Sequence, residues 1–245
     1  MDRLLYTAMT GARQTLLAQA QNNNNLANVS TVGFRAELSA FTDAPIYGPG
    51  HPSRVYSELS LGATDLSAGP LQTTGRELDL ALSEGGWLAV QAPDGSEAYT
   101  RAGDLRIDAG GVLVTGAGHP VLGAGGPIAV PPAEKLEIAA DGGIHIIPPG
   151  EGAKPVPLER LRLVRPEPAR LEKGYDGLMR VNDGQPVADD ATVRVSVGAL
   201  EGSNVNAVGA LVEMIALARR YEAQVRMMRA AEDTDSALTR VMGAD

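Results

Sequence analysis

The sequence contains no cysteine, only three histidines, and few aromatic residues, which make up 4% of its 245 positions. Without cysteine the chain can form no disulfide framework, no thiolate zinc site and no cysteine nucleophile. The histidines, His51, His119 and His145, are too few and too far apart along the chain to suggest a metal centre. We therefore predict that the protein uses neither a metal nor an organic cofactor.

The chain also lacks an excess of basic residues. Lysine and arginine number 21 against 30 aspartates and glutamates, which gives a formal net charge of −9. A protein that neutralises phosphate groups presents a basic surface, so this balance argues against a nucleic-acid partner.

Long apolar runs are missing as well. No stretch approaches the roughly 20 apolar residues of a membrane-spanning helix, so we predict no membrane insertion. The start of the sequence offers only Leu4, Leu5 and Tyr6 in succession, which is shorter than the apolar core of about 7 to 15 residues in a signal peptide. If the protein leaves the cytoplasm, we expect export without a cleaved signal peptide.

Proline and glycine are concentrated in the middle of the chain. All 16 prolines lie between Pro45 and Pro186, and most of the 29 glycines fall in the same stretch. Turn signals such as Pro93-Asp94-Gly95 recur there at intervals of about ten residues, between short runs rich in Val, Ile, Leu and Thr. This spacing predicts an antiparallel β domain over 81–189, with 31–80 and 190–204 as extended connectors.

Both ends of the chain carry apolar residues at helical spacing, in steps of three and four. The C-terminal stripe consists of Leu211, Met214, Ala218, Tyr221, Val225 and Met228, and the N-terminal stripe includes Leu5, Met9, Ala12 and Leu16. Sustained spacing of this kind favours coiled-coil packing, and 1–30 with 205–243 form a predicted discontinuous helical domain whose stripes need partner helices. Ser203 or Asn204 is the expected N-cap of the second helix. The predicted fold is α+β, with long N- and C-terminal helices forming a coiled-coil-like layer and an intervening antiparallel β domain.

Three segments have residues found in catalytic or binding sites, but each fits a structural role. The glycines of 116–127 lead into Pro127 and a β-like run, whereas a phosphate cradle requires a following helix. Asp189 and Asp190 are adjacent and would point to opposite sides of a strand. Ser203 lacks the second glycine of a nucleophile elbow. We predict no catalytic residue and no small-molecule substrate.

One longer string is specific. Residues 24–35 read Asn-Asn-Leu-Ala-Asn-Val-Ser-Thr-Val-Gly-Phe-Arg. This string closely resembles the N-terminal signature of the bacterial flagellar axial proteins of the rod and hook, in which Asn-Asn-Leu-Ala-Asn, a threonine, and Gly-Phe with a basic residue recur. Further blocks resemble the same family in the same order, at 75–82, 86–90, 99–104, 113–115, 198–206, 214–215 and 219–222. Arg35 stands where lysine is common, and Trp87-Leu88 where two phenylalanines are common.

The resemblance implies a non-catalytic structural subunit of the flagellar basal-body rod in the periplasm, which transmits torque. Its partners would be other rod proteins, copies of itself packed head to tail into a helical tube, and the flagellar export apparatus. Residues 1–12 and 121–128 look most like the proximal rod branch, and a distal rod or hook protein is the alternative. The assembly residues implied beside the two stripes are those of the turn: Asn25, Leu26, Ala27, Asn28, Gly33, Phe34 and Arg35.

Two alternatives come from other classes of protein. A β-rich adhesin or carbohydrate-binding module would need exposed aromatic residues on one sheet face, and 81–189 holds only Trp87, Tyr99 and Tyr175. A wall-remodelling enzyme would need a convergent acid and base, which the sequence does not suggest. For a rod subunit we expect Gly33→Val and Phe34→Ala to impair flagellation and to leave the melting temperature of the β domain nearly unchanged.

Overall fold

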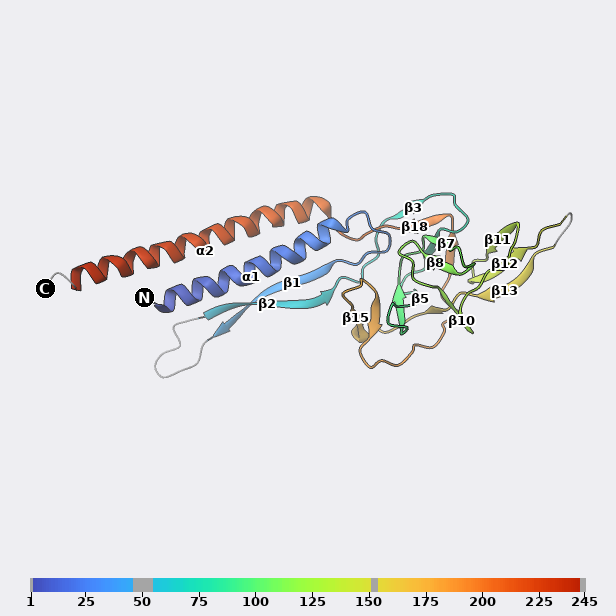
Figure 1. Ribbon diagram of the computed structural model, residues 1–245, viewed down its shortest axis with the longest axis horizontal. Helices are drawn as coiled ribbons and strands as arrows, with labels where there is room; N and C mark the ends of the chain where they lie inside the picture. The colour runs from blue at the N-terminus through green and yellow to red at the C-terminus, as the bar shows by residue number, and fades with distance from the viewer. Residues whose placement is uncertain (1, 46–54, 151–153, 243–245) are drawn as a thin grey trace. The chain divides into compact units, whose positions relative to one another are not determined.

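The computed structural model describes residues 2–45, 55–150 and 154–242, and the chain divides into two compact units (Figure 1). The helical unit consists of Met1–Ala27, Glu37–Ala63 and Asn206–Asp245, and the β unit consists of Asn28–Ala36 and Thr64–Val205. The chain therefore passes from one unit to the other after residues 27, 36, 63 and 205.

The helical unit contains two helices and a β-hairpin. Its helices are α1 (Asp2–Ala27) and α2 (Ala207–Met242), and its hairpin is formed by β1 (Glu37–Pro45) and β2 (Val55–Thr64). In Figure 1 the two helices lie side by side, with the hairpin beside α1. The face of α1 that is buried carries small side chains, among them Ala8, Ala12, Thr15 and Ala18. Small side chains allow two helix backbones to approach closely.

The predicted coiled-coil-like helical layer is wrong, although the chain is α+β. The described residues hold only two α-helices, and nearly all other regular structure is β. The two helices pack against the β-hairpin as well as against each other. Phe41 and Leu59 of the hairpin contact Ala18 of α1 and Leu217 of α2. Of the N-terminal stripe, Leu5, Met9 and Leu16 are exposed and Ala12 is buried. Spacing by three and four is common to several faces of a helix, and on α1 the packed face is the one with small side chains.

The N-cap of α2 is Asn206, and the expectation of Ser203 or Asn204 is wrong. The side-chain Oδ1 of Asn206 accepts a hydrogen bond from the backbone N–H of Gly209 at 3.1 Å, which satisfies a donor of the first helical turn. Ser203 and Asn204 belong to the β unit. Both have other roles there.

The β unit is built from short antiparallel strands. Five strands form its largest sheet in the order β14-β5-β6-β16-β15, three form the sheet β11-β12-β13, and the others pair as β3 with β18, β4 with β17, β7 with β8 and β9 with β10. The strands are β3 (Leu71–Thr73), β4 (Leu80–Leu82), β5 (Trp87–Gln91), β6 (Glu97–Thr100), β7 (Leu105–Ile107), β8 (Leu113–Thr115), β9 (Leu122–Gly123), β10 (Gly126–Pro127), β11 (Lys135–Ile138), β12 (Gly143–Ile147), β13 (Val156–Arg160), β14 (Leu163–Val164), β15 (Leu171–Lys173), β16 (Met179–Val181), β17 (Val195–Val197) and β18 (Ala199–Glu201). A 3-10 turn, Pro168–Arg170, precedes β15.

Strand β5 lies between two hydrophobic cores. Leu88 and Val90 point into the larger core, whereas Trp87 and Ala89 pack with Tyr99 and other residues in the smaller one. A strand that is buried on both faces reads as a continuous apolar run rather than an alternating one. This arrangement buries Trp87, with 5% of its surface exposed, beside the side chains of Arg35 and Arg101.

Candidate functional site

Glu201, at the end of β18, is the centre of a buried ion cluster in the β unit. Its Oε1 accepts a hydrogen bond from Nη2 of Arg35 at 2.5 Å. Its Oε2 accepts from Nε of Arg101 at 2.8 Å and also from Nη2 of the same guanidinium. The three side chains are between 1% and 4% exposed. We call Arg35, Arg101 and Glu201 the junction triad.

The junction triad carries a net positive charge in a place that water does not reach, because two guanidiniums share one carboxylate. Burial lowers the pKa of Arg101 below its ordinary value, the carboxylate of Glu201 opposes this effect, and the charge of Arg35 adds to it. Arginine remains protonated in proteins even so. The backbone carbonyls of residues 82, 83 and 86 accept the remaining hydrogen bonds of Arg101. The guanidinium carbons of Arg35 and Arg101 lie 5.9 and 6.0 Å from the centroid of the Trp87 ring, which is within the range of a cation–π contact.

Gly33 and Phe34 pack into the β unit next to the junction triad. Gly33 has a φ of +66°, and its N–H donates to the carbonyl oxygen of Glu201 at 2.8 Å. A Cβ at this position would overlap the backbone of Arg101 and Ala102. The Nζ of Lys173 lies 3.8 Å from the centroid of the Phe34 ring and donates to the carbonyl oxygen of Arg35 at 2.8 Å.

These contacts overturn the expectation that Gly33→Val and Phe34→Ala would leave the β unit's stability unchanged. A side chain at residue 33 must both adopt a left-handed conformation and displace a neighbouring backbone segment. Truncation of Phe34 removes the ring that Lys173 covers. Both substitutions therefore act on the folding of the β unit itself.

Asn204 holds together three segments of the β unit that are far apart in sequence. Its Oδ1 accepts from the backbone N–H of Ala36 at 2.7 Å, and its Nδ2 donates to the carbonyl oxygens of Asp65 at 2.9 Å and Ser67 at 3.1 Å. The N–H of Asp65 in turn donates to the carbonyl oxygen of Ala36 at 2.8 Å. Each of these segments directly adjoins a residue at which the chain passes to or from the helical unit.

The predicted turn from Asn25 to Arg35 is divided between the two units. Asn25, in α1, makes two hydrogen bonds with the backbone of Glu37. Its Nδ2 donates to the carbonyl oxygen of Glu37 at 2.8 Å, and its Oδ1 accepts from the N–H of Glu37 at 2.9 Å. Leu26 is half-buried and Ala27 is exposed at the end of α1. Asn28 begins the β unit and accepts a hydrogen bond from the Thr31 hydroxyl at 3.1 Å.

The two predicted stripes lie partly at the surface of the helical unit. On α1 only Ala12 of the stripe is buried. On α2 Leu211 is exposed, and the five other members are half-buried: Met214, Ala218, Tyr221, Val225 and Met228. Leu211 also belongs to a set of aliphatic residues on α2 that is open to solvent: Val208, Leu211, Val212 and Ile215. They follow the spacing i, i+3, i+4 and i+7, so they share one side of the helix, and we call this set the α2 apolar face.

Sequence reasoning missed Arg101, Glu201, Asn204 and Lys173 as members of the site. Arg35 and Glu201 are 166 positions apart, and no local periodicity reports a contact over that distance. The signal that could have found two of them is the C-terminal block 198–206, which resembles the family signature and contains Glu201 and Asn204.

Within residues 2–45, 55–150 and 154–242, no three His, Asp or Glu side chains gather in a way that could hold a metal ion. No helix of the part of the chain that the structure describes combines the length and the apolar character that crossing a bilayer requires.

Comparison with known proteins identifies the family. Residues 196–241 match the family model "Flagellar basal body rod FlgEFG protein C-terminal", and residues 81–146 match "Flagellar hook protein FlgE/F/G D1 domain". The flagellar basal-body rod protein FlgF of Escherichia coli K12 is 46% identical over 240 residues, which cover 95% of each chain. FlgF of Salmonella typhimurium is 43% identical over 242 residues, which cover 96% of each chain. The rod protein FlgG of Bacillus subtilis is 30% identical over 256 residues, which cover 95% of this chain and 96% of the FlgG chain. The predicted family is confirmed, and the chain belongs to the FlgF flagellar basal-body rod proteins.

Proposed function

We propose that this chain, a structural subunit of the flagellar basal-body rod, builds the proximal rod by packing its exposed helix faces against helices of neighbouring subunits. The α2 apolar face is the observation that carries this proposal. Its four members are 48% to 71% exposed, although aliphatic side chains gain about 1.5–3 kcal/mol each when fully buried. A row of such residues along one helix face is typical of an interaction site.

The α2 apolar face is confined to the start of the helix. Arg219, Glu222 and Arg226 continue the same side of α2 and are exposed and charged. A partner helix would therefore bury about two turns of α2 and then meet charged side chains that set its register. This pattern supports a contact of defined length rather than an unlimited zipper.

Helix α1 exposes a second apolar set, formed by Leu5, Met9, Leu16 and Leu17, which are 40% to 51% exposed. Two different apolar faces on one subunit can make a heterologous contact, in which the face of one copy or homologue meets the other face of the next. Repetition of a contact that does not close yields a helical tube. We propose head-to-tail assembly of this kind, with other rod proteins and further copies of this chain as partners.

The junction triad supports a mechanical role in the same proposal. Buried ion pairs and hydrogen bonds hold the segments at which the chain enters and leaves the β unit, so a load on these segments acts on an ordered cluster rather than on a loose linker. We propose that the subunit transmits torque in the periplasm, that it reaches the rod through the flagellar export apparatus without a cleaved signal peptide, and that it performs no catalysis.

The adhesin alternative has little support in the β unit. Trp87 and Tyr99 are 5% and 1% exposed, so they belong to the core and cannot stack on a ligand. Tyr175 is fully exposed, but a carbohydrate platform of the kind considered needs several aromatic residues on one sheet face.

The test is a charge placed within the α2 apolar face. We expect Val212→Asp to leave the folding and export of the subunit intact, because Val212 is 62% exposed, and to abolish incorporation into the rod. Ala230→Asp is the matched control, since Ala230 is exposed on the same helix but lies beyond the charged residues that end the face. Swimming in soft agar, flagella counted by electron microscopy and thermal unfolding of the purified variants are the measurements. Normal flagella in the Val212→Asp strain would overturn the proposal.

A further inference from the structure

A groove of about 670 Å³ opens in the β unit between the start of β11 and the turn that connects β7 to β8. Its floor is apolar and includes Leu78, Ile107, Val130 and Leu136. Ile107 is 42% exposed, although it is a large aliphatic residue of a paired strand. No member of the junction triad lines this groove. Its volume is in the range of sites that take one or a few side chains or a small ligand.

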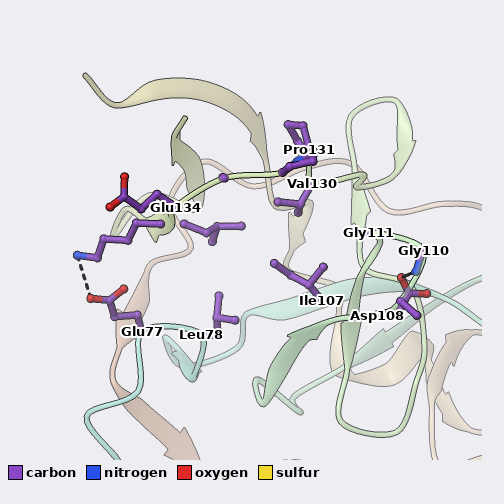
Figure 2. A pocket seen from close by; sticks show the side chains of 14 residues that line it. Glu77, Leu78, Ile107, Asp108, Gly110, Gly111, Val130, Pro131 and Glu134 are labelled. Carbon is purple, nitrogen blue, oxygen red and sulfur yellow. Dashed lines mark hydrogen bonds and ion pairs between the residues drawn. The ribbon is translucent and has the colours of Figure 1, made fainter. Parts of the chain in front are cut away.

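Carboxylates stand at both ends of the groove. Figure 2 shows Glu77 and Glu134 at one end and Asp108 at the other, with Leu78, Ile107 and Val130 between them. The carboxylate of Asp108 is held by hydrogen bonds from the N–H groups of Gly110 and Val112, both at 2.8 Å.

Lys135 does not balance these acids. Its Nζ lies 2.9 Å from Oε1 of Glu77 and 3.0 Å from Oε1 of Glu137, so its single charge is shared between two carboxylates. Among the described residues that line the groove, Lys135 is the one basic side chain. The rim is therefore acidic.

The backbone beside the groove also offers hydrogen-bonding groups. Strand β11 pairs with β12 on one side, and the sheet order β11-β12-β13 leaves its other side without a strand partner in the part of the chain that the structure describes. An edge strand presents every second N–H and C=O group outward. Pro131 and Pro132, which precede the strand, lack N–H groups and limit this free edge to a few residues.

We infer that this groove binds an extended segment of a partner protein in which an apolar side chain stands between two basic ones. In an extended segment, residues i, i+2 and i+4 share one face, so a central aliphatic residue can enter the apolar floor and the two flanking cations can reach the acids at the ends. The chain's own net charge of −9 disfavours a second copy of the β unit as the occupant. This surface is separate from the helix faces of the proposed function and does not depend on them.

The test measures peptide binding to the purified full chain. The probe is acetyl-Arg-Ser-Ile-Ser-Arg-amide with a fluorophore, followed by fluorescence anisotropy at low and high salt. Two control peptides separate charge from apolar contact: Glu-Ser-Ile-Ser-Glu reverses the charge, and Arg-Ser-Ser-Ser-Arg removes the aliphatic side chain. We expect no saturable binding of the first control, and binding of the second roughly tenfold weaker than that of the probe, as loss of one buried aliphatic contact produces. Added salt should weaken binding of the probe.

Two variants and a matched control assign the binding to this groove. Ile107→Ser should weaken binding of the probe by roughly tenfold, because it removes an aliphatic side chain from the floor of the groove. Glu134→Gln should weaken binding of the probe and reduce the salt dependence of that binding. Val156→Ser changes an aliphatic residue that is 47% exposed on β13, at the opposite edge of the same sheet, and should have no effect.

Three results of the peptide titrations would overturn the inference: equal binding of all three peptides, unchanged affinity of Ile107→Ser and Glu134→Gln, or an equal loss in Val156→Ser. Self-association in sedimentation equilibrium that Ile107→Ser abolishes would assign the groove to a second copy and would also overturn it. None of these results depends on flagellar assembly.

Discussion

Replacing Glu201 with glutamine removes the one negative charge of the junction triad and keeps the shape of the side chain. Arg35 and Arg101 would then lie buried, each less than 5% exposed, without the carboxylate that both guanidiniums contact. Breaking a buried ion pair by removing one partner costs about 3–5 kcal/mol. For a unit of this size about 2–4 °C of melting temperature corresponds to 1 kcal/mol, so we expect a decrease of roughly 6–20 °C in the melting temperature of the β unit.

The arithmetic of the charges also predicts an order among variants. Arg35→Met leaves Arg101 and Glu201 as a neutral pair, whereas Glu201→Gln leaves two like charges. Within the described residues, Nε and Nη1 of Arg35 are buried and have no hydrogen-bond partner, so removing this guanidinium also removes an existing penalty. Arg35→Met should therefore cost less free energy of unfolding than Glu201→Gln.

Trp87 provides the assay, because it is the only tryptophan and lies beside the triad. Urea unfolding followed by its fluorescence reports on the β unit alone, and the free energies come from linear extrapolation. Glu172→Gln, an exposed glutamate on β15, is the control and should stay within about 0.5 kcal/mol of the parent. The reasoning is refuted if Glu201→Gln also stays within that range, or if Arg35→Met costs more than Glu201→Gln.

Three further predictions concern other parts of the structure. Gly33→Ala should destabilise the β unit by about 1–3 kcal/mol more than Gly95→Ala, because both glycines have positive φ but only residue 33 faces a neighbouring backbone, and equal losses in urea unfolding would contradict this. Burial raises the pKa of Tyr99 from 10.0 to about 12, so above pH 10 the unfolded chain releases a proton that the native protein keeps. Tyr99 therefore contributes stability that is intact below pH 10 and is lost as the pH rises towards 12. Tyr99→Phe should flatten this decline in urea midpoints measured between pH 10 and 12. Ala18→Leu should cost about 1–3 kcal/mol by overpacking against Leu59 and Leu217, whereas the exposed Ala20→Leu should be nearly neutral, as helix loss monitored by circular dichroism will show.

The sequence predicted the kinds of secondary structure better than their packing. Confinement of proline to 45–186 correctly separates a turn-rich middle from two helical ends, because proline acts locally on the backbone. The buried face of α1 could not be read in the same way. The predicted stripe contains Ala12 but not Ala8 or Ala18, because a search for hydrophobic stripes gives more weight to larger residues, such as the exposed Met9. The packed face is the one whose small side chains allow a neighbouring helix to approach closely.

The candidate site shows a second limit. The string at 24–35 identified the family, and it contains Gly33, Phe34 and Arg35, which the structure places together beside the triad. Its partners are supplied by β18 and by the residue after β6. The resemblance implied an assembly role for Arg35, and only the fold shows that its side chain is buried within the β unit.

The junction triad also bears on the order in which the chain folds. It joins Glu201 to residues 166 and 100 positions earlier, whereas hairpins such as β5–β6 and β7–β8 close over short loops. Contacts at long sequence separation require that intervening chain be ordered first, because loop closure costs entropy. The triad therefore closes late, and its removal should accelerate unfolding more than it slows refolding. A chain that ends before residue 201 would leave its buried arginines without their carboxylate, so only a chain that includes Glu201 can finish the β unit.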